Sequence, residues 1–306
     1  MKLGIIYAGQ GSQVVGMGKS FYPREIFDQN EDLKELCFNG PLEKLSYTPY
    51  TQPCMVMVAT IITDLLKEHG IVPDYTAGLS LGEYSALYCA GVFKRQQVID
   101  LARFRGKVMQ EAVSEIESEM IAVLGMKEEL LQDLCHQASS LGVVSISNYN
   151  CPGQLVVAGE KKAVEKVKEL ALENKARRVI ALNTSGPFHT SLLKEASLAL
   201  KERFKKETFH EMKIPVIFNT LGHEIEYQSI PEILEKQVMS PVYFEKSIRY
   251  MIDQGVDTII EVGPGKVLSG FVKKINKDIQ LYQIEDNESL EKTIKALKGE
   301  DYEIRK

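Results

Sequence analysis

The sequence contains no tryptophan, and it has only five histidines and five cysteines in 306 residues. An odd number of cysteines cannot all be paired in disulfides, and their spacing matches no metal-binding motif. We therefore expect buried thiols in a reducing compartment, no metal site, and a cytoplasmic location. The cysteines are Cys37, Cys54, Cys89, Cys135 and Cys151.

The chain also lacks a long apolar run and a strong net charge. No apolar stretch approaches the roughly 20 residues of a membrane span, and residues 3–8 are too few for the hydrophobic region of a signal peptide. The formal net charge is −5, with 26% charged residues, which gives no general reason to bind nucleic acid. We expect neither a membrane nor a nucleic-acid partner, and the length allows one large domain with a small insert.

The most informative motif is Gly78-Leu79-Ser80-Leu81-Gly82. A short strand is predicted to end at Ala77, and the apolar spacing from Leu81 to Ala90 is that of a helix. A serine in a tight turn between strand and helix is typical of a nucleophile elbow, where the flanking glycines relieve crowding. The backbone N–H of Leu81 would then face a developing oxyanion. An ordinary glycine-flanked turn is the alternative.

The middle of the chain predicts a separate small fold. The expected order of its elements is βαββαβ, which defines the split βαβ or ferredoxin-like unit. We place this unit at 119–187, as an insert between the two parts of a large domain, 1–118 and 188–306. Strands are expected at 121–125, 143–147, 154–158 and 178–182, and helices at 128–138 and 161–173.

The large domain alternates strands with helices. Strands are expected at 3–7, 75–77, 215–219 and 258–262. Helices between them predict a mostly parallel sheet covered on both faces, so the fold class is α/β.

His189 is the candidate general base. It lies in a loop, 183–190, that is rich in turn-forming residues and joins a strand to a helix. Loops that leave the sheet often carry the catalytic groups of α/β proteins. A structural histidine is the alternative. The other histidines, at a helix end, in the insert, in a polar stretch and in a turn, are His69, His136, His210 and His223.

Arg105 falls on the apolar face of the helix expected at 94–113, whereas Arg103 and Lys107 lie off that face. A buried guanidinium needs a partner, because an unpaired buried charge costs roughly several kcal/mol. Two interpretations are open: a structural pair with a core carboxylate, or a bidentate clamp for a substrate carboxylate.

Gly9-Gln10-Gly11 follows the first strand. A Walker A loop would need glycine at Gln13, and a dinucleotide-binding fingerprint would need glycine at Val14, so both are excluded. The segment remains a tight turn whose backbone N–H groups can complete an oxyanion hole.

Taken together, these segments resemble the malonyl-CoA:acyl carrier protein transacylases of bacterial fatty-acid synthesis along nearly the whole chain. The resemblance implies a hydrolase-like α/β core that carries the ferredoxin-like insert. The matching segments are 9–13, 16–18, 80–86, 105–107, 109–112, 152–154 and 261–268.

The resemblance also implies residue roles. Ser80 would be the nucleophile and His189 its base, oriented by the backbone carbonyl of Gln237. Arg105 would bind the malonyl carboxylate. The backbone N–H groups of Gln10 and Leu81 would bind the oxyanion. Phe188 would line a pocket that fits malonyl better than methylmalonyl.

The implied reaction is ping-pong transfer of malonyl from malonyl-CoA to holo acyl carrier protein, with no cofactor. Two positions depart from the family pattern, because Leu79 replaces a usual histidine and Ala8 a usual proline. One alternative is a serine thioesterase or hydrolase. These enzymes carry their catalytic acid and histidine late in the chain, whereas the last histidine here is His223. The others are a stand-alone acyltransferase of a polyketide synthase and an inactive carrier-binding module, which the intact Ser80, His189 and Arg105 disfavour.

Overall fold

The computed structural model describes residues 1–304, and the chain divides into two compact units. The first comprises Met1–Gly106, Phe209–Ile217 and Met251–Lys306, and the second comprises Lys107–Thr208 and Phe218–Tyr250. The second unit thus contains the insert expected at 119–187 together with neighbouring segments. The domain borders expected from the sequence stay a prediction.

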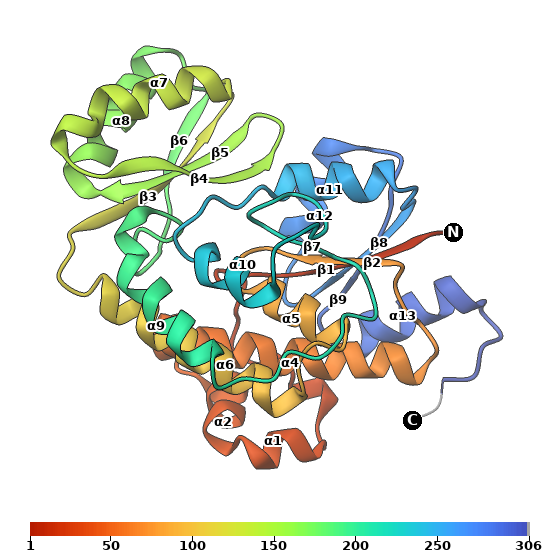
Figure 1. Ribbon diagram of the computed structural model, residues 1–306. Helices are drawn as coiled ribbons and strands as arrows, with labels where there is room; N and C mark the ends of the chain where they lie inside the picture. The colour runs from red at the N-terminus through yellow and green to blue at the C-terminus, as the bar shows by residue number, and fades with distance from the viewer. Residues whose placement is uncertain (305–306) are drawn as a thin grey trace. The chain divides into compact units, whose positions relative to one another are not determined.

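The first unit is built on a parallel five-stranded sheet in the order β7-β2-β1-β8-β9 (Figure 1). Every neighbouring pair of strands runs parallel. All five residues of the central strand β1 are buried, as expected for a sheet with helices on both faces. The α/β prediction is therefore confirmed. The strands are β1 Leu3–Tyr7, β2 Tyr75–Gly78, β7 Val216–Ile217, β8 Thr258–Val262 and β9 Gln280–Ile284.

The helices of the first unit include one that is buried nearly all round, α4 (Thr48–Glu68). Its apolar residues fall on all faces, so it packs inside the unit and covers α5, which in turn packs on β1 and β2. The others are η1 Lys19–Phe21, α1 Glu25–Gln29, α2 Glu31–Asn39, α3 Leu42–Leu45, α5 Gly82–Cys89, the first part of α6 Arg95–Ala112, α12 Val267–Ile275 and α13 Asn287–Lys298.

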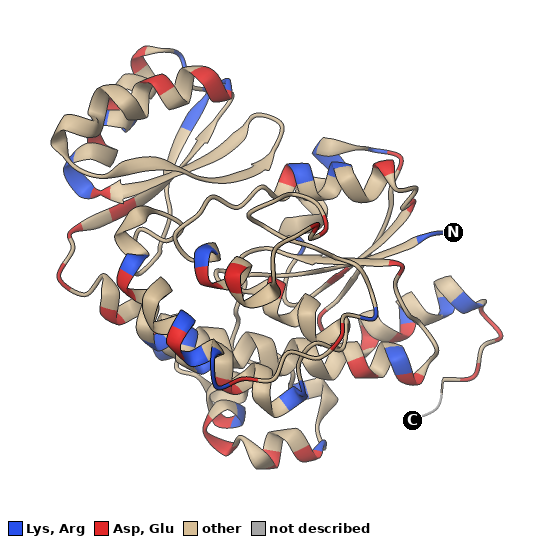
Figure 2. Cartoon of the chain, viewed as in Figure 1, with Lys and Arg blue, Asp and Glu red and all other residues tan. Residues whose placement is uncertain are grey.

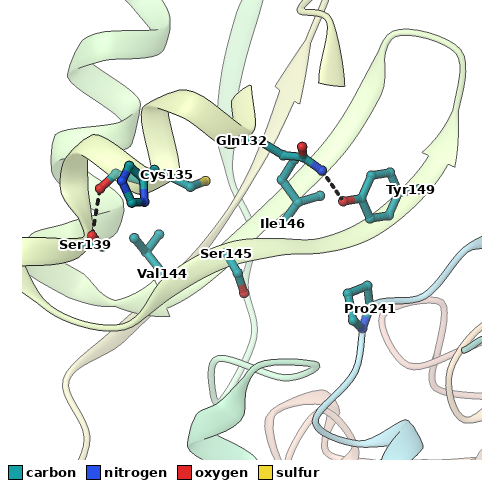
Figure 3. A pocket seen from close by; sticks show the side chains of 9 residues that line it. Gln132, Cys135, Ser139, Val144, Ser145, Ile146, Tyr149 and Pro241 are labelled. Carbon is teal, nitrogen blue, oxygen red and sulfur yellow. Dashed lines mark hydrogen bonds between the residues drawn. The ribbon is translucent and has the colours of Figure 1, made fainter. Parts of the chain in front are cut away.

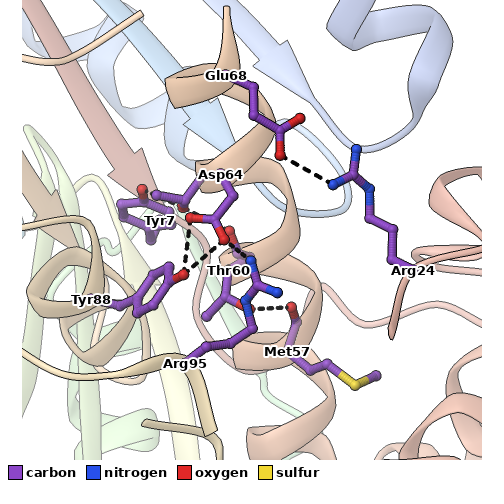
Figure 4. Close-up of polar contacts among 10 residues, drawn as sticks. Tyr7, Arg24, Met57, Thr60, Asp64, Glu68, Tyr88 and Arg95 are labelled. Atoms are coloured by element: carbon purple, nitrogen blue, oxygen red, sulfur yellow. Dashed lines mark hydrogen bonds and ion pairs between the residues drawn. The ribbon is translucent and has the colours of Figure 1, made fainter. Parts of the chain in front are cut away.

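A polar network joins α4 to its neighbours (Figure 4). Asp64 accepts hydrogen bonds from the Tyr88 hydroxyl, at 2.9 Å to each carboxylate oxygen, and forms an ion pair with Arg95. One turn further along α4, Glu68 pairs with Arg24 at 3.4 Å. These contacts fix the ends of α5 and α6 against α4, so the partly buried Asp64 has a structural role.

The second unit contains an antiparallel four-stranded sheet in the order β4-β5-β3-β6. Two helices pack on the same face of this sheet (Figure 1). The chain order βαββαβ and the strand order confirm the ferredoxin-like prediction. The elements are β3 Ser118–Leu124, α7 Glu128–Ala138, β4 Val144–Cys151, β5 Gln154–Glu160, α8 Lys161–Glu173 and β6 Arg178–Ala181.

The other regular elements of the second unit are helices. α9 and α10 pack together, and the Ser197 hydroxyl donates a hydrogen bond of 2.7 Å to the carbonyl of Glu235 near the end of α10. This contact helps to fix the carboxyl end of α10. The elements are η2 Ser139–Leu141, η3 Ser191–Leu193, α9 Lys194–Phe204, α10 Ile230–Gln237 and parts of α6 and of α11 Phe244–Asp253.

Charged side chains of both signs are mixed along the helices and loops (Figure 2). All five cysteines are buried and none forms a disulfide, which confirms the prediction of core thiols. Within residues 1–304, no helix has the length and apolar character needed to cross a bilayer.

Candidate active site

Ser80 lies in the turn between β2 and α5 and has a φ of 53°, in the left-handed region. This conformation is strained for a residue with a side chain, and it persists only where its surroundings hold it. Two backbone hydrogen bonds do so: the Leu79 N–H to Tyr7 O and the Gly82 N–H to Leu79 O, each of 3.0 Å. The segment therefore has the shape of a nucleophile elbow.

The glycines of the turn are required by close approach. A Cβ at Gly78 would lie 1.9 Å from the backbone carbon of Gly82, and a Cβ at Gly82 would lie 2.2 Å from the carbonyl oxygen of Tyr7. Gly9 is also tight, because its Cβ would lie 2.5 Å from the Leu79 carbonyl oxygen. The first loop and the elbow thus fit together only when these positions carry no side chain.

Two backbone donors are available beside the elbow. Among the described residues, the N–H groups of Leu81 and Gln10 donate no hydrogen bond. Leu81 is the N-terminal cap residue of α5, and Gln10 follows β1, the strand paired with β2. The side chain of Gln10 is anchored by a 2.8 Å hydrogen bond from Nε2 to the hydroxyl of Thr48. Donors of this kind can bind an oxyanion.

Arg105 is 1% exposed, on the buried face of α6 as predicted. Its Nη1 donates to Gln52 Oε1 at 2.9 Å and its Nη2 to Ser80 Oγ at 3.2 Å, while the guanidinium carbon lies 5.4 Å from the ring centre of Tyr84. Burial lowers the pKa of Arg105, and the nearby Tyr84 and Glu83 act in the opposite direction. The guanidinium is therefore held beside the elbow serine.

His189 belongs to the second unit, is 3% exposed and has a φ of 64°. Its backbone N–H donates to Val238 O at 3.0 Å. Its ring Nδ1 lies 2.9 Å from the carbonyl oxygen of Gln237 and 3.1 Å from that of Ser240. Carbonyl oxygens only accept hydrogen bonds, so Nδ1 carries the proton, and in a neutral ring Nε2 is then the basic nitrogen. The ring is thus in the tautomer that a general base requires.

Phe188 precedes this histidine and is 7% exposed. A Cβ at Gly186 would lie 3.1 Å from its ring and 2.6 Å from the side chain of Val113. The glycine therefore makes room for the phenylalanine ring.

The structure groups the predicted residues by unit. Ser80, Arg105, Gln10 and Leu81 lie in the first unit, and His189, Gln237 and Phe188 lie in the second. No group of three or more His, Cys, Asp or Glu side chains among residues 1–304 could hold a metal ion.

Sequence reasoning missed three contacts. Gln52 and Tyr84 hold Arg105, and Ser240 is the second carbonyl facing His189. The sequence could have indicated Gln52 as a site residue, because it is polar on a helix that is apolar nearly all round. Ser240 contributes only its backbone, which no residue type reveals.

Comparisons with known proteins extend over the whole chain. The model of the acyl transferase domain family matches residues 5–299. The malonyl CoA-acyl carrier protein transacylase of Bacillus subtilis is 42% identical over 312 residues, which cover 98% of each chain. The crystal structure of the Clostridium perfringens malonyl CoA-acyl carrier protein transacylase has 42% identity and a TM-score of 0.93, with 98% of each chain covered.

A further solved structure contains a carrier protein. It is described as a holo type II polyketide synthase acyl-carrier protein in complex with its malonyl-transacylase, and it has 34% identity and a TM-score of 0.92 over 97% of this chain and 100% of that chain. The fold and the motifs thus define an acyltransferase. The chain belongs to the acyl transferase domain family and, within it, to the malonyl CoA-acyl carrier protein transacylases, as the resemblance predicted.

Proposed function

We propose that this protein transfers the malonyl group from malonyl-CoA to the phosphopantetheine thiol of holo acyl carrier protein, and so supplies fatty-acid synthesis. Membership of the family supports the reaction. One observation in the structure carries the proposal: a buried cation, Arg105, donates a hydrogen bond of 3.2 Å to the oxygen of the elbow serine, Ser80. An acyl group attached to that oxygen would lie beside the guanidinium, and malonyl carries a carboxylate to pair with it.

The first half-reaction forms a malonyl-serine ester. Ser80 Oγ attacks the thioester carbonyl while Nε2 of His189 takes the hydroxyl proton. The N–H groups of Leu81 and Gln10 stabilise the negative charge that develops on the carbonyl oxygen. The carbon–sulfur bond then breaks, and the CoA sulfur leaves with the proton from His189.

The second half-reaction runs the same steps in the opposite direction. The phosphopantetheine thiol gives its proton to His189 and attacks the ester carbon. The ester carbon–oxygen bond breaks and Ser80 Oγ recovers its proton from the imidazolium. The site must exclude water while the ester exists, since hydrolysis would release free malonate.

The pair works without a carboxylate on His189. The carbonyl oxygens of Gln237 and Ser240 already fix the proton on Nδ1. An aspartate in a catalytic triad has the same orienting task, and it also stabilises the imidazolium. Two neutral carbonyl dipoles supply part of that stabilisation here.

The acyl preference is assigned to two side chains. Arg105 pairs with the malonyl carboxylate, and an uncharged acyl group would leave the guanidinium without that partner. Phe188 narrows the acyl pocket against the extra methyl group of methylmalonyl. Leu79, half-buried next to the elbow serine, adds no charge to the pocket.

Intact-mass spectrometry tests the proposal directly. Mixing with malonyl-CoA should add one malonyl group to the protein, and holo acyl carrier protein should then remove it and gain the same mass. Ser80→Ala should remain unlabelled. Ser114→Ala, which changes an exposed serine, is the matched control and should be labelled like the wild type. A labelled Ser80→Ala protein would contradict the assignment.

The pathway has a second candidate. A solved relative with 34% identity is the malonyl-transacylase partner of a polyketide carrier protein, so service to a polyketide synthase is the alternative. The ratio of kcat/KM for fatty-acid and polyketide carrier proteins separates the two. We also infer a cytoplasmic location, supported by five buried cysteines that form no disulfide, and cell fractionation tests it.

A further inference from the structure

The carbonyl of Ser240, one of the two that face His189 Nδ1, lies outside any helix. The other carbonyl belongs to Gln237, the last residue of α10, and is held by that helix. Ser240 belongs to the connection between α10 and α11: its N–H donates to Gln237 O at 3.3 Å, and its position also depends on the residues that follow it. What fixes residues 240–243, the connector, therefore decides how well the second carbonyl meets the histidine.

The connector pairs with the outer edge of β4. The Val242 N–H donates to Ser147 O at 2.9 Å, and the Tyr149 N–H donates to Val242 O at 2.8 Å, which makes a parallel bridge. The register of β4 against β5 shifts between Ile146 and Asn148. Such a bulge turns backbone groups away from the regular ladder and frees them for another partner. Val242 itself is fully buried.

Side chains reinforce this bridge. The rings of Tyr149 and Tyr243 stack, with their centroids 4.9 Å apart and their planes at 27°. The Tyr243 N–H donates to Asn219 O at 2.8 Å, and Gln132 Nε2 donates to the Tyr149 hydroxyl at 3.4 Å. The aromatic stack is therefore a side-chain contact that joins the connector to the insert sheet.

The connector meets open space at Pro241. Pro241 borders a cavity of about 350 Å³ between α7 and β4, whose wall also includes Tyr149 (Figure 3). A segment with open space on one side is held only by its remaining contacts. For the connector, these include the β4 bridge, the Tyr149–Tyr243 stack, the bond to Asn219 and the 3.3 Å bond from the Ser240 N–H to Gln237 O.

We propose that Tyr149 is a positioning residue for His189: by stacking on Tyr243 it holds the connector, and with it the Ser240 carbonyl, against the histidine ring. The inference rests on the proposed function for its kinetic consequence. Strand β4 (Val144–Cys151), distant in sequence from the histidine, thereby takes part in setting the tautomer and the direction of the base.

The test compares Tyr149→Leu, which removes the stack, with Tyr149→Phe, which keeps it. In Tyr149→Leu we expect kcat for malonyl transfer to fall roughly tenfold with little change in KM, because a misplaced base slows chemistry without weakening substrate binding. Tyr149→Phe should restore most of kcat. Tyr243→Leu should cause the same loss, and the double variant should lose no more than either single one. Tyr227→Leu, at a tyrosine 93% exposed, is the surface control.

A second readout does not depend on activity. In protein labelled with ¹⁵N-histidine, the Nδ1–H signal of His189 should broaden or shift in Tyr149→Leu and stay in place in Tyr149→Phe and Tyr227→Leu. A wild-type kcat and an unchanged signal in Tyr149→Leu would overturn the proposal. So would a loss of kcat that follows the unfolded fraction alone. If the wild type transferred no malonyl, the proposed function would fail, while the histidine signal would still decide the positioning.

Discussion

Arg105 donates a hydrogen bond from Nη2 to the Oγ of Ser80, over 3.2 Å and between side chains 25 residues apart in sequence. Arg105 is 1% exposed, so its positive charge is buried away from bulk water. In the protein without an acyl group, the neutral hydroxyl of Ser80 accepts a hydrogen bond from one N–H group of the guanidinium. A carboxylate on an attached acyl group would replace that weak acceptor by a charged one, which is a stronger interaction at this distance.

Arg105→Ala should therefore change the choice of acyl group. Malonyl transfer should lose about 2–5 kcal/mol of transition-state stabilisation, the cost of deleting one partner of a buried charged pair. Acetyl transfer should hold or rise, since acetyl has no carboxylate to lose. The measurement is kcat/KM for malonyl-CoA and acetyl-CoA, with thermal unfolding alongside.

Two further variants sharpen this test. Arg105→Lys should recover only part of the malonyl activity, because an ammonium lacks the planar fork of a guanidinium. Arg103→Ala, on the same helix but paired at the surface with Asp32, should leave the malonyl-to-acetyl ratio unchanged. If a folded Arg105→Ala protein kept the wild-type ratio, the arginine would be a structural residue.

Much of the fold could be predicted because its signals are local. The helix α7 and the strand β8 have the predicted bounds, 128–138 and 258–262, since their apolar period runs unbroken between polar ends. The burial of Arg105 followed from the same reasoning about a helical face. The βαββαβ order then defined the insert.

Other parts of the fold and of the site could not be predicted from the sequence, for physical reasons. The helices α1, α2 and α3 at 25–45 have only 5, 9 and 4 residues, too few turns to produce a clear period. β4 runs to Cys151 rather than ending at the expected 147, because its bulges break the alternation of buried and exposed residues. Contacts such as His189 with Ser240 join residues 51 positions apart through a backbone atom, which leaves no trace in the residue types.

Alanine substitutions at two glycines, one in the elbow and one in α12, should have opposite effects on the stability of the fold. Gly78→Ala should destabilise the protein by more than about 3 kcal/mol, because the new methyl group would overlap backbone rather than a movable side chain. Gly270→Ala is the matched control, since nothing lies within 4 Å of its Cβ position and it is inside α12. That change should stabilise the fold by roughly 0.5–1 kcal/mol. Urea unfolding of both variants measures the difference, and a Gly78→Ala protein as stable as the wild type would show that the turn can relax.

Asp286 should link stability to pH. Its side chain caps α13 by accepting a 2.8 Å hydrogen bond from the Ser289 N–H, and bonds from Ser289 lower its pKa from the usual 3.8. The folded-state pKa lies below the unfolded one, so the charged cap stabilises the protein above pH 3.8 and this contribution is lost as pH falls through the folded value.

Asp286→Ala should accordingly cost about 1 kcal/mol at neutral pH. Asp286→Asn keeps a capping oxygen but cannot titrate, so the difference in unfolding free energy between wild type and this variant should shrink below pH 4. Denaturant unfolding from pH 7 down to about 3 measures it. A difference that stays constant over this range would mean that another group sets the acid response.

Ser80 and His189 should behave as one functional unit although they belong to different compact units of the chain. His189→Ala should reduce malonyl transfer by at least about 10²-fold, the usual scale for a general base, and Ser80→Ala should abolish the ester. The base acts only through the nucleophile, so the double variant should be no slower than Ser80→Ala alone. His210→Ala, at an exposed histidine, is the control and should transfer malonyl at the wild-type rate. The four variants are compared by the rate at which malonyl appears on holo acyl carrier protein. Losses that multiply in the double variant would show that the two side chains act in separate steps, and the base would then have to be sought elsewhere.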